Sequence, residues 1–474
     1  MKLAFPPQVV VSVVFVSAMF MNIMDSTVVN VALPALSRSF DVPLASVSGV
    51  VTAYLVTLAV AMPASGWLGD KFGARPVMLG AVGLFTAASA LCGIATSLPE
   101  LVAFRVLQGV GGGILVPVGM AMAFRAFPPA ERIRVTRYLT VPTLIAPATG
   151  PVIGGALVSG LSWRWIFYIN VPVGTAALVF GLLFLPKGSQ YPAGRFDLRG
   201  FLLAAAGFPL AMFALSSGAT GGWASATVLV TGIAGLAGLA AFIVAELRSA
   251  QPMLDLRVLG NRLFRTTTTQ ITVAGAGFSG SLFLVPLLLQ DGLGFSALHS
   301  GLSTFTEAIG GMIGIQIATR VYKRVGPRRL MIAGMAGAAA TLGGIALAGA
   351  STAPWLIPLL FGLTGCCFGF AMAPSQTAAM TAVSAARTGH ASTLVNALRQ
   401  AGGAAGVAIL GTVLTVSRAS SADLAGFRVS LAAAAILMLI ALLVSTRVRD
   451  ADADASLQRD SAASPDPAPV PEVA

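Results

Sequence analysis

Apolar runs long enough to cross a membrane dominate this 474-residue chain. The hydrocarbon core of a bilayer takes about 20 residues of helix, and the sequence offers fourteen such runs. Only 10% of the residues are charged, against about 25% in soluble domains. The chain is therefore predicted to be an all-α integral membrane protein in contact with the lipid bilayer. The predicted spans are residues 9–32, 45–65, 77–97, 100–124, 137–159, 165–185, 199–217, 226–246, 267–290, 299–318, 330–350, 354–379, 393–416 and 427–446.

Basic residues are distributed unevenly between the two sides of these spans. Of the 29 Lys and Arg residues, 23 fall on the side that carries both termini. Positive loops stay in the cytoplasm, so both termini are predicted to be cytoplasmic, in a bacterial plasma (inner) membrane. The net charge of +12 then orients the helices, and no nucleic-acid partner is expected. Four basic residues lie on the other side and two inside spans: Arg38, Arg164, Arg418 and Arg428, then Arg105 and Arg399.

An internal repeat divides the chain. G-W-L-G-D-K-F-G-A-R at 66–75 closes the second span and R-V-Y-K-R-V-G-P-R-R at 320–329 closes the tenth, with Gly73 aligned to Gly326. Repeated halves are typical of transporters, whose substrate site lies between them. The predicted parts are a six-helix half at 1–190, a two-helix insert at 191–262, a six-helix half at 263–446, and a disordered cytoplasmic tail at 447–474.

Asp25 stands alone as an acid in the first apolar run. A carboxylate at that depth costs at least about 2.5–3.5 kcal/mol and faces a protein interior or a wet cavity. On a helix it shares one polar face with Asn22 and Asn30. Two readings stay open: a site that alternates between protonated and ionised forms, or a satisfied acid that bonds Asn22 or Asn30 and holds helices together.

Glu307 is a second acid at membrane depth, about 12 Å into the tenth span at the rise of a helix. It is predicted either to carry a second proton or to anchor a cationic substrate. The alternative is a structural acid paired with a hydroxyl of Thr304 or Thr306.

Five stretches carry a family resemblance. Together they resemble the major facilitator superfamily and, within it, the fourteen-helix drug:proton antiporter family. The resemblance implies two six-helix halves around a central cavity. The stretches are M-D-S-T-V-V-N-V-A-L-P at 24–34, the 66–75 loop, L-V-A-F-R-V-L-Q-G-V-G-G-G at 101–113, A-T-G-P-V-I-G-G-A at 148–156 and W-R-W-I-F-Y-I-N-V-P at 163–172.

Arg105, in the fourth span, either snorkels to the outer interface or, as the resemblance implies, faces the central cavity near the proton site. Gln108 extends its polar face deeper and favours the cavity. The 148–156 stretch resembles the antiporter motif, which implies a hinge between the halves. Its small residues also suit close helix packing. They are Gly150, Pro151, Gly154 and Gly155.

The loop after the second span is predicted to gate the transporter. Gly73 suits a tight turn with positive φ, and contacts between Asp70 and Arg75 would hold one conformation closed. The alternative is a loop that only orients the helices.

These features predict a proton-coupled exporter of small amphipathic compounds, such as drugs or antibiotics, that works by alternating access and functions as a monomer. The alternatives are a carrier for one metabolite, a membrane enzyme and a non-transporting sensor. With no catalytic constellation, metal cluster or nucleotide motif, the only expected cofactor is the proton, and the three cysteines are read as small apolar residues. Candidate cavity residues are Asn22, Asn30, Tyr54, Gln108, Gln270, Phe278, Phe283 and Gln376.

Overall fold

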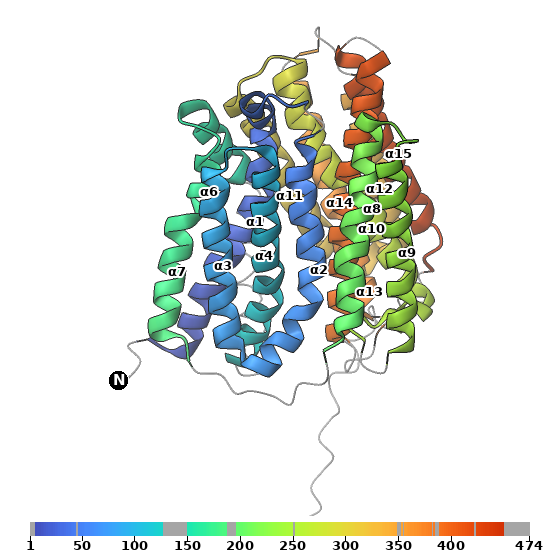
Figure 1. The fold of residues 1–474 in the computed structure, drawn as a ribbon. Coiled ribbons are helices and arrows are strands. Elements are labelled where there is room, and N and C mark those ends of the chain that lie inside the picture. Colours follow the sequence, from blue (N-terminus) through green and yellow to red (C-terminus); the bar gives the residue numbers. More distant parts are fainter. Residues whose placement is uncertain are drawn as a thin grey trace, which may run out of the picture.

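Long helices that cross the molecule from end to end make up the computed structural model (Figure 1). Within the described residues all regular structure is helical, which confirms the predicted all-α class. The structure describes residues 5–43, 46–126, 149–186, 196–249, 252–347, 352–353, 355–381, 383, 388–420 and 423–449. The predicted tail at 447–474 lies outside them from residue 450 onward.

The helices fall into three groups along the chain. The first group contains α1 (Pro7–Phe40), α2 (Ser48–Phe72), α3 (Ala74–Ile94), α4 (Leu98–Ala126), the helical residues 149–160, α6 (Trp165–Tyr168) and α7 (Asn170–Phe184). The second contains α8 (Leu198–Gly221) and α9 (Ala226–Arg248). The third contains the 3-10 turn η2 (Leu256–Gly260), α10 (Arg262–Leu287), the π-helical turn η3 (Leu288–Gly292), α11 (Ala297–Val325), α12 (Pro327–Ala346), α13 (Leu356–Thr381), α14 (Thr388–Ser420) and α15 (Asp423–Ser445).

Twelve helices of the described chain are long and apolar enough to cross a membrane. The helix α11 is not among these twelve. It has 29 residues and covers the tenth predicted span. The fifth predicted span, 137–159, is described only from residue 149. Several helices run past their apolar runs; α1 spans 34 residues because its polar end continues the helix beyond Pro34.

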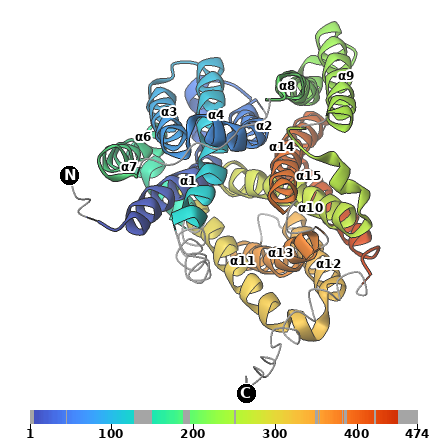
Figure 2. The same ribbon diagram turned by 90° about the horizontal axis from the view of Figure 1, so that it is seen from below.

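Viewed along the helices, the first and third groups form two bundles, and α8 and α9 stand beside them next to α2 and α14 (Figure 2). We call the side where α1 begins the lower side, as in Figure 1, and the side where α1 ends the upper side. Successive helices alternate in direction, so that α2 begins on the upper side. The last helix, α15, therefore returns to the lower side.

The repeat appears in the backbone as the same turn in both bundles. Gly73, between α2 and α3, has φ 89° and ψ 143°. Gly326, between α11 and α12, has φ 82° and ψ 155°. Glycine adopts this conformation without a steric penalty, which explains why both copies of the loop carry it.

Polar contacts join the two bundles at the upper side. They include an Arg38–Asp291 ion pair of 3.6 Å, a 2.9 Å hydrogen bond from Gln290 Nε2 to the Val31 carbonyl, and a 3.2 Å bond from Leu298 N to Ser159 Oγ. The bundles are therefore tied together at the end opposite the N-terminus.

Candidate functional site

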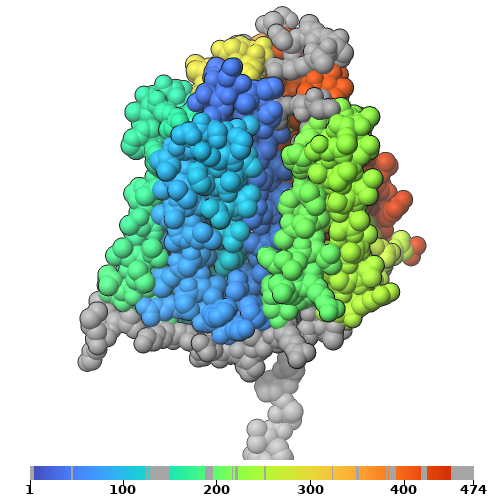
Figure 3. All heavy atoms as spheres, in the orientation of Figure 1, coloured from blue at the N-terminus to red at the C-terminus, as the bar shows by residue number. Residues whose placement is uncertain are grey.

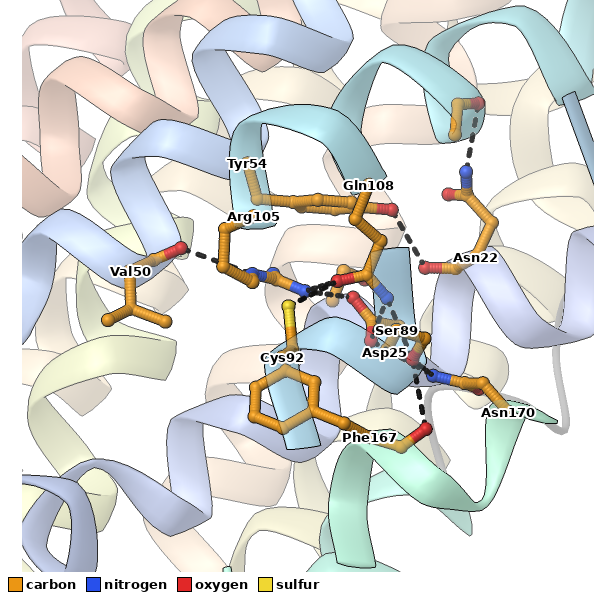
Figure 4. Close-up of polar contacts among 12 residues, drawn as sticks. Asn22, Asp25, Val50, Tyr54, Ser89, Cys92, Arg105, Gln108, Phe167 and Asn170 are labelled. Atoms are coloured by element: carbon orange, nitrogen blue, oxygen red, sulfur yellow. Dashed lines mark hydrogen bonds and ion pairs between the residues drawn. The ribbon is translucent and has the colours of Figure 1, made fainter. Parts of the chain in front are cut away.

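Asp25 lies at the centre of a buried polar network in the first bundle (Figure 4). Its side chain is fully buried and forms an ion pair with Arg105 of α4. Asp25 Oδ1 also accepts hydrogen bonds from Gln108 Nε2 at 2.8 Å and from Asn170 Nδ2 at 3.1 Å. Every partner is a donor, so the geometry is that of an ionised carboxylate.

Arg105 is almost as deeply buried, with 1% of its surface exposed. Its NH1 group donates to Gln108 Oε1 at 2.8 Å as well as to Asp25, and its Nε donates to the Val50 carbonyl at 3.3 Å. The guanidinium carbon lies 4.1 Å from the centre of the Tyr54 ring, within cation–π range. Arg105 therefore faces the predicted proton site and does not snorkel to an interface.

A second layer of residues holds the amides in place. Ser89 of α3 accepts hydrogen bonds from Gln108 at 3.2 Å and from Asn170 at 3.1 Å, and donates to the Phe167 carbonyl at 2.9 Å. Cys92 Sγ lies 3.7 Å from Gln108 Oε1. Ser89 and Cys92 lie on α3 and Phe167 on α6. The network therefore joins residues of α1, α2, α3, α4, α6 and α7, which all belong to one bundle.

Sequence analysis missed Ser89, Cys92 and Asn170. Asn170 had a signal, since it is an amide within the 163–172 stretch at the start of an apolar run. Cys92 was read as an apolar residue, yet its thiol contacts the network.

The expected pairing of Asp25 with Asn22 or Asn30 is wrong. Asn22 Nδ2 donates to the Gly112 carbonyl at 2.9 Å, and Asn30 Nδ2 donates to the Ser26 carbonyl at 3.3 Å. The partners of Asp25 come instead from α4 and α7. Side chains on one face of α1 point in similar directions, so the donors that reach Asp25 lie on the neighbouring helices.

Glu307 lies in α11 with 7% of its surface exposed. Among the described residues it has no hydrogen bond or ion pair. The expected threonine partners donate elsewhere: Thr304 Oγ1 to the Ser300 carbonyl at 2.9 Å, and Thr306 Oγ1 to the Pro358 carbonyl at 2.6 Å. A buried acid without a donor is costly as a carboxylate, so this geometry suits a protonated group.

The predicted cavity residues come from both bundles. Asn22, Tyr54 and Gln108 belong to or touch the Asp25 network.

The other cavity candidates lie in the second bundle. Gln270 is fully buried, and within the described part of the chain neither atom of its amide group has a hydrogen-bond partner. Phe278 stacks on Phe368 with ring centres 3.8 Å apart. Phe283 is fully buried in the apolar core, whereas Gln376 is exposed.

The small residues of helix 149–160 lie against both bundles. A Cβ on Gly154 would come within 3.1 Å of the Val28 carbonyl oxygen, and the space beside Gly150 is filled by Thr27 of α1. On the other side, a Cβ on Gly155 would come within 2.6 Å of the Ala297 carbonyl oxygen. Of the predicted hinge residues, Gly155 thus lies where the two bundles touch, whereas Gly150 and Gly154 pack against α1 of their own bundle.

Pro151 and the loop residues complete this set. Gly301 of α11 packs directly on the Pro151 carbonyl. At the lower side, Arg75 NH2 donates to the Leu182 carbonyl at the end of α7, at 2.8 Å. Asp70 lies two residues before the end of α2.

The model of the major facilitator superfamily matches residues 15–407 of the chain. The chain belongs to the major facilitator superfamily. Within the superfamily it is similar to proteins named for multidrug resistance. The multidrug resistance protein B homolog of Mycobacterium tuberculosis (strain ATCC 25618 / H37Rv) is 35% identical over 406 residues, which are 85% of this chain and 75% of that protein. The putative multidrug resistance protein MdtD of Salmonella paratyphi A is 37% identical over 320 residues, 66% of this chain and 67% of that protein.

Solved structures of other major facilitator proteins share the fold. A peptide transporter POT in complex with sulfate has a TM-score of 0.69 at 15% identity, with 94% of this chain and 96% of that chain covered. A bacterial homolog of the human lysosomal transporter Spinster, in an inward-facing and unoccupied conformation, has a TM-score of 0.66 at 15% identity, with 98% and 100% covered. At such identities the likeness concerns the fold alone. As a member of the major facilitator superfamily, the chain is a membrane transporter.

Proposed function

We propose that this transporter exports small amphipathic compounds, such as drugs or antibiotics, in exchange for protons, and that it works by alternating access. The observation that carries the proposal is the fully buried Asp25 carboxylate, ion-paired with Arg105 inside an otherwise apolar bundle. An ionisable residue within a membrane marks a proton or ion pathway by default. The names of the multidrug resistance relatives support the substrate class.

Protonation of Asp25 supplies the coupling step. The added proton neutralises the carboxylate and takes one of its acceptor positions, so Arg105 loses its counter-charge. Leaving a buried charge uncompensated costs about 3–5 kcal/mol. The guanidinium must then find another acceptor or reach water, and either change moves α4 relative to α1.

The contacts at the upper side belong to one conformation of the proposed transport cycle. With Gln290, Leu298 and Arg38 joining the bundles there, the conformation is closed on the upper side. The charge bias of the sequence makes the lower side cytoplasmic. In this proposal the substrate enters from the cytoplasm and leaves when the upper contacts break.

Glu307 supplies a second protonation site in the proposal. It lies in the opposite bundle from Asp25, is buried, and has no partner among the described residues. A protonated Glu307 releases its proton when a cationic substrate takes its place. Two acids in two bundles then exchange two protons for one cation.

The test is flux in vesicles with an imposed pH gradient. Full-length wild type and Asp25→Asn are reconstituted, and a panel of fluorescent cationic and neutral compounds is followed. Asparagine keeps the size of the side chain and removes its titration, so gradient-driven flux should fall to background. Binding of the neutral compounds should persist and become independent of pH, whereas binding of the cationic compounds keeps the pH dependence that Glu307 supplies.

Glu100→Gln is the matched control. Glu100 is also a carboxylate, but it is exposed and bonds Thr96 at the start of α4. Its variant should keep wild-type flux. Gradient-driven flux in Asp25→Asn equal to wild type would remove Asp25 from the coupling step.

A further inference from the structure

A membrane-facing groove separates α8 from the first bundle. It lies between α2, α4 and α8 and has a volume of about 580 Å³. Figure 3 shows the furrow between the blue helices and the green α8. It lies outside the Asp25 network, and the proposed exchange cycle makes no use of it.

The groove persists because α8 packs elsewhere. Gly207 of α8 lies so close to α9 that a Cβ there would come within 2.9 Å of Leu239 N. The upper part of α8 is joined to α14 by a 3.1 Å hydrogen bond from Thr412 Oγ1 to the Leu215 carbonyl. α8 also contacts α2, and between these contacts Phe201 and Phe213 of α8 line the groove.

The walls of the groove suit hydrocarbon and not water. Apart from Thr52 and Thr57, every residue that lines it is apolar. Thr57 Oγ1 already donates to the Ala53 carbonyl at 2.8 Å. A water molecule needs two to four polar partners, which these walls do not offer.

The groove also has the dimensions of a bilayer ligand. On α2 it runs from Gly49 to Leu68, which is about 28 Å at 1.5 Å per residue. One leaflet supplies about half of the hydrocarbon thickness of about 30 Å, so the groove is long enough to hold an acyl chain of one leaflet along its whole length. Its volume falls in the usual range of ligand sites, about 300–1,000 Å³.

One polar atom inside the groove has no partner. Thr52 is 7% exposed, lines the groove, and its Oγ1 makes no hydrogen bond to any residue that the structure describes. It lies one helical turn from Ser48, where α2 begins at the upper side. That depth is the boundary between the acyl chains and the headgroups, where the ester carbonyls of a phospholipid lie.

We propose that the groove binds an acyl chain of a phospholipid from the leaflet on the upper side, with the ester carbonyl accepting a hydrogen bond from Thr52 Oγ1. The bound lipid fills the space between the two-helix unit α8–α9 and the first bundle. Unlike the lipids around the protein, it is held by three helices and one hydrogen bond. It is a bound ligand with slow exchange.

The test uses full-length protein in nanodiscs that contain a phospholipid with a diazirine in its acyl chain. After illumination, the labelled peptides are mapped by mass spectrometry. We expect labelling of groove residues on α2 and α8 that survives a chase with unlabelled lipid. Labelling of Ile233 and Leu236, which are exposed on α9, should be lost in the same chase.

Two pairs of variants make the test specific. Ala205→Phe fills the groove and should abolish the chase-resistant labelling, whereas Ala206→Phe, on the exposed neighbouring position of α8, should leave it unchanged. Thr52→Val keeps the shape and removes the hydroxyl. It should reduce retained label about two- to tenfold, the range that one neutral hydrogen bond supplies.

The proposal would be overturned by groove labelling that washes out as fast as labelling on α9. Unchanged retention in both Ala205→Phe and Thr52→Val would also overturn it. So would displacement of the label by a transported compound, because the groove would then be a substrate site.

Discussion

Arg105 shows how much a single side chain does in the buried network. It pairs with Asp25, donates to Gln108 and to the Val50 carbonyl, and stacks on Tyr54. These contacts use the planar fork of a guanidinium, which an ammonium cannot reproduce. The positive charge alone is therefore not sufficient.

We expect Arg105→Lys to keep the charge and lose function. Loss of one hydrogen bond made by a charged group costs about 1.5–3 kcal/mol, so the free energy of unfolding should fall by at least that amount and coupled flux with it. Thermal unfolding in detergent and vesicle flux measure the two effects. Arg199→Lys, at an exposed position of α8, is the control, and equal behaviour of the two variants would contradict the role of the fork.

Asp25 could be predicted from the sequence, and the family resemblance placed Arg105 near it, but the third partner, Asn170, was not predicted. An acid in an apolar run is visible without any structure, since its cost in hydrocarbon depends on its own charge. Asn170 lies 145 residues away, and its contact depends on how α7 is rotated against α1. Hydropathy carries no information on that rotation.

At the level of helices, the contact between helix 149–160 and α11 determines how closely the bundles approach. Gly155 and Gly301 both lie against backbone of the other bundle. Small residues are the only ones that permit this distance. The upper side can close only while these positions stay small.

We therefore expect Gly155→Ala to favour a conformation open at the upper side. The added methyl would lie within 2.6 Å of the Ala297 oxygen, and the bundles must separate to avoid it. Distances between spin labels on the upper ends of α1 and α11 should lengthen. Gly160→Ala is the control because open space surrounds that position; identical distance distributions in both variants would show that the contact does not limit closure.

The number and order of helices were predictable because each apolar run must satisfy its own backbone in lipid. Two local features were not. The sixth predicted span, 165–185, is interrupted at Ile169 between α6 and α7, which places Asn170 at the start of a helix. The π-helical turn η3 follows α10, and its Gln290 bonds the other bundle.

For the whole molecule, the proposed two acids determine how transport responds to voltage. At about 100 mV one charge is worth about 2.3 kcal/mol, and one pH unit is worth about 1.36 kcal/mol. Exchange of two protons for one monovalent cation moves a net charge and gains from both terms. Exchange of one proton for one cation gains only from the pH term, roughly a tenfold gradient.

Glu307→Gln should thus make cation export electroneutral. Flux of a monovalent cationic compound, measured in vesicles clamped at different potentials, should depend on voltage in wild type and lose that dependence in the variant. The pH dependence should remain, because Asp25 is intact. Voltage dependence that is the same in both proteins would show that Glu307 carries no coupled proton.

The two-bundle arrangement was predictable from the repeated loop, since Gly73 and Gly326 adopt the same turn. Which side is closed was not. That choice depends on contacts such as Gln290 with Val31, 259 residues apart, whose formation differs between states of one sequence. A single sequence encodes every state of the cycle and does not mark which one a structure displays.

Every partner of Asp25 comes from the first bundle. This has an evolutionary consequence, because a proton site whose residues lie within one bundle can be inherited as a unit. Mutations that alter the second bundle can then change which compounds are recognised without rebuilding the acid and its donors. Chimeras that exchange second bundles between relatives would keep the Asp25 network while differing in cargo and in the second protonation site.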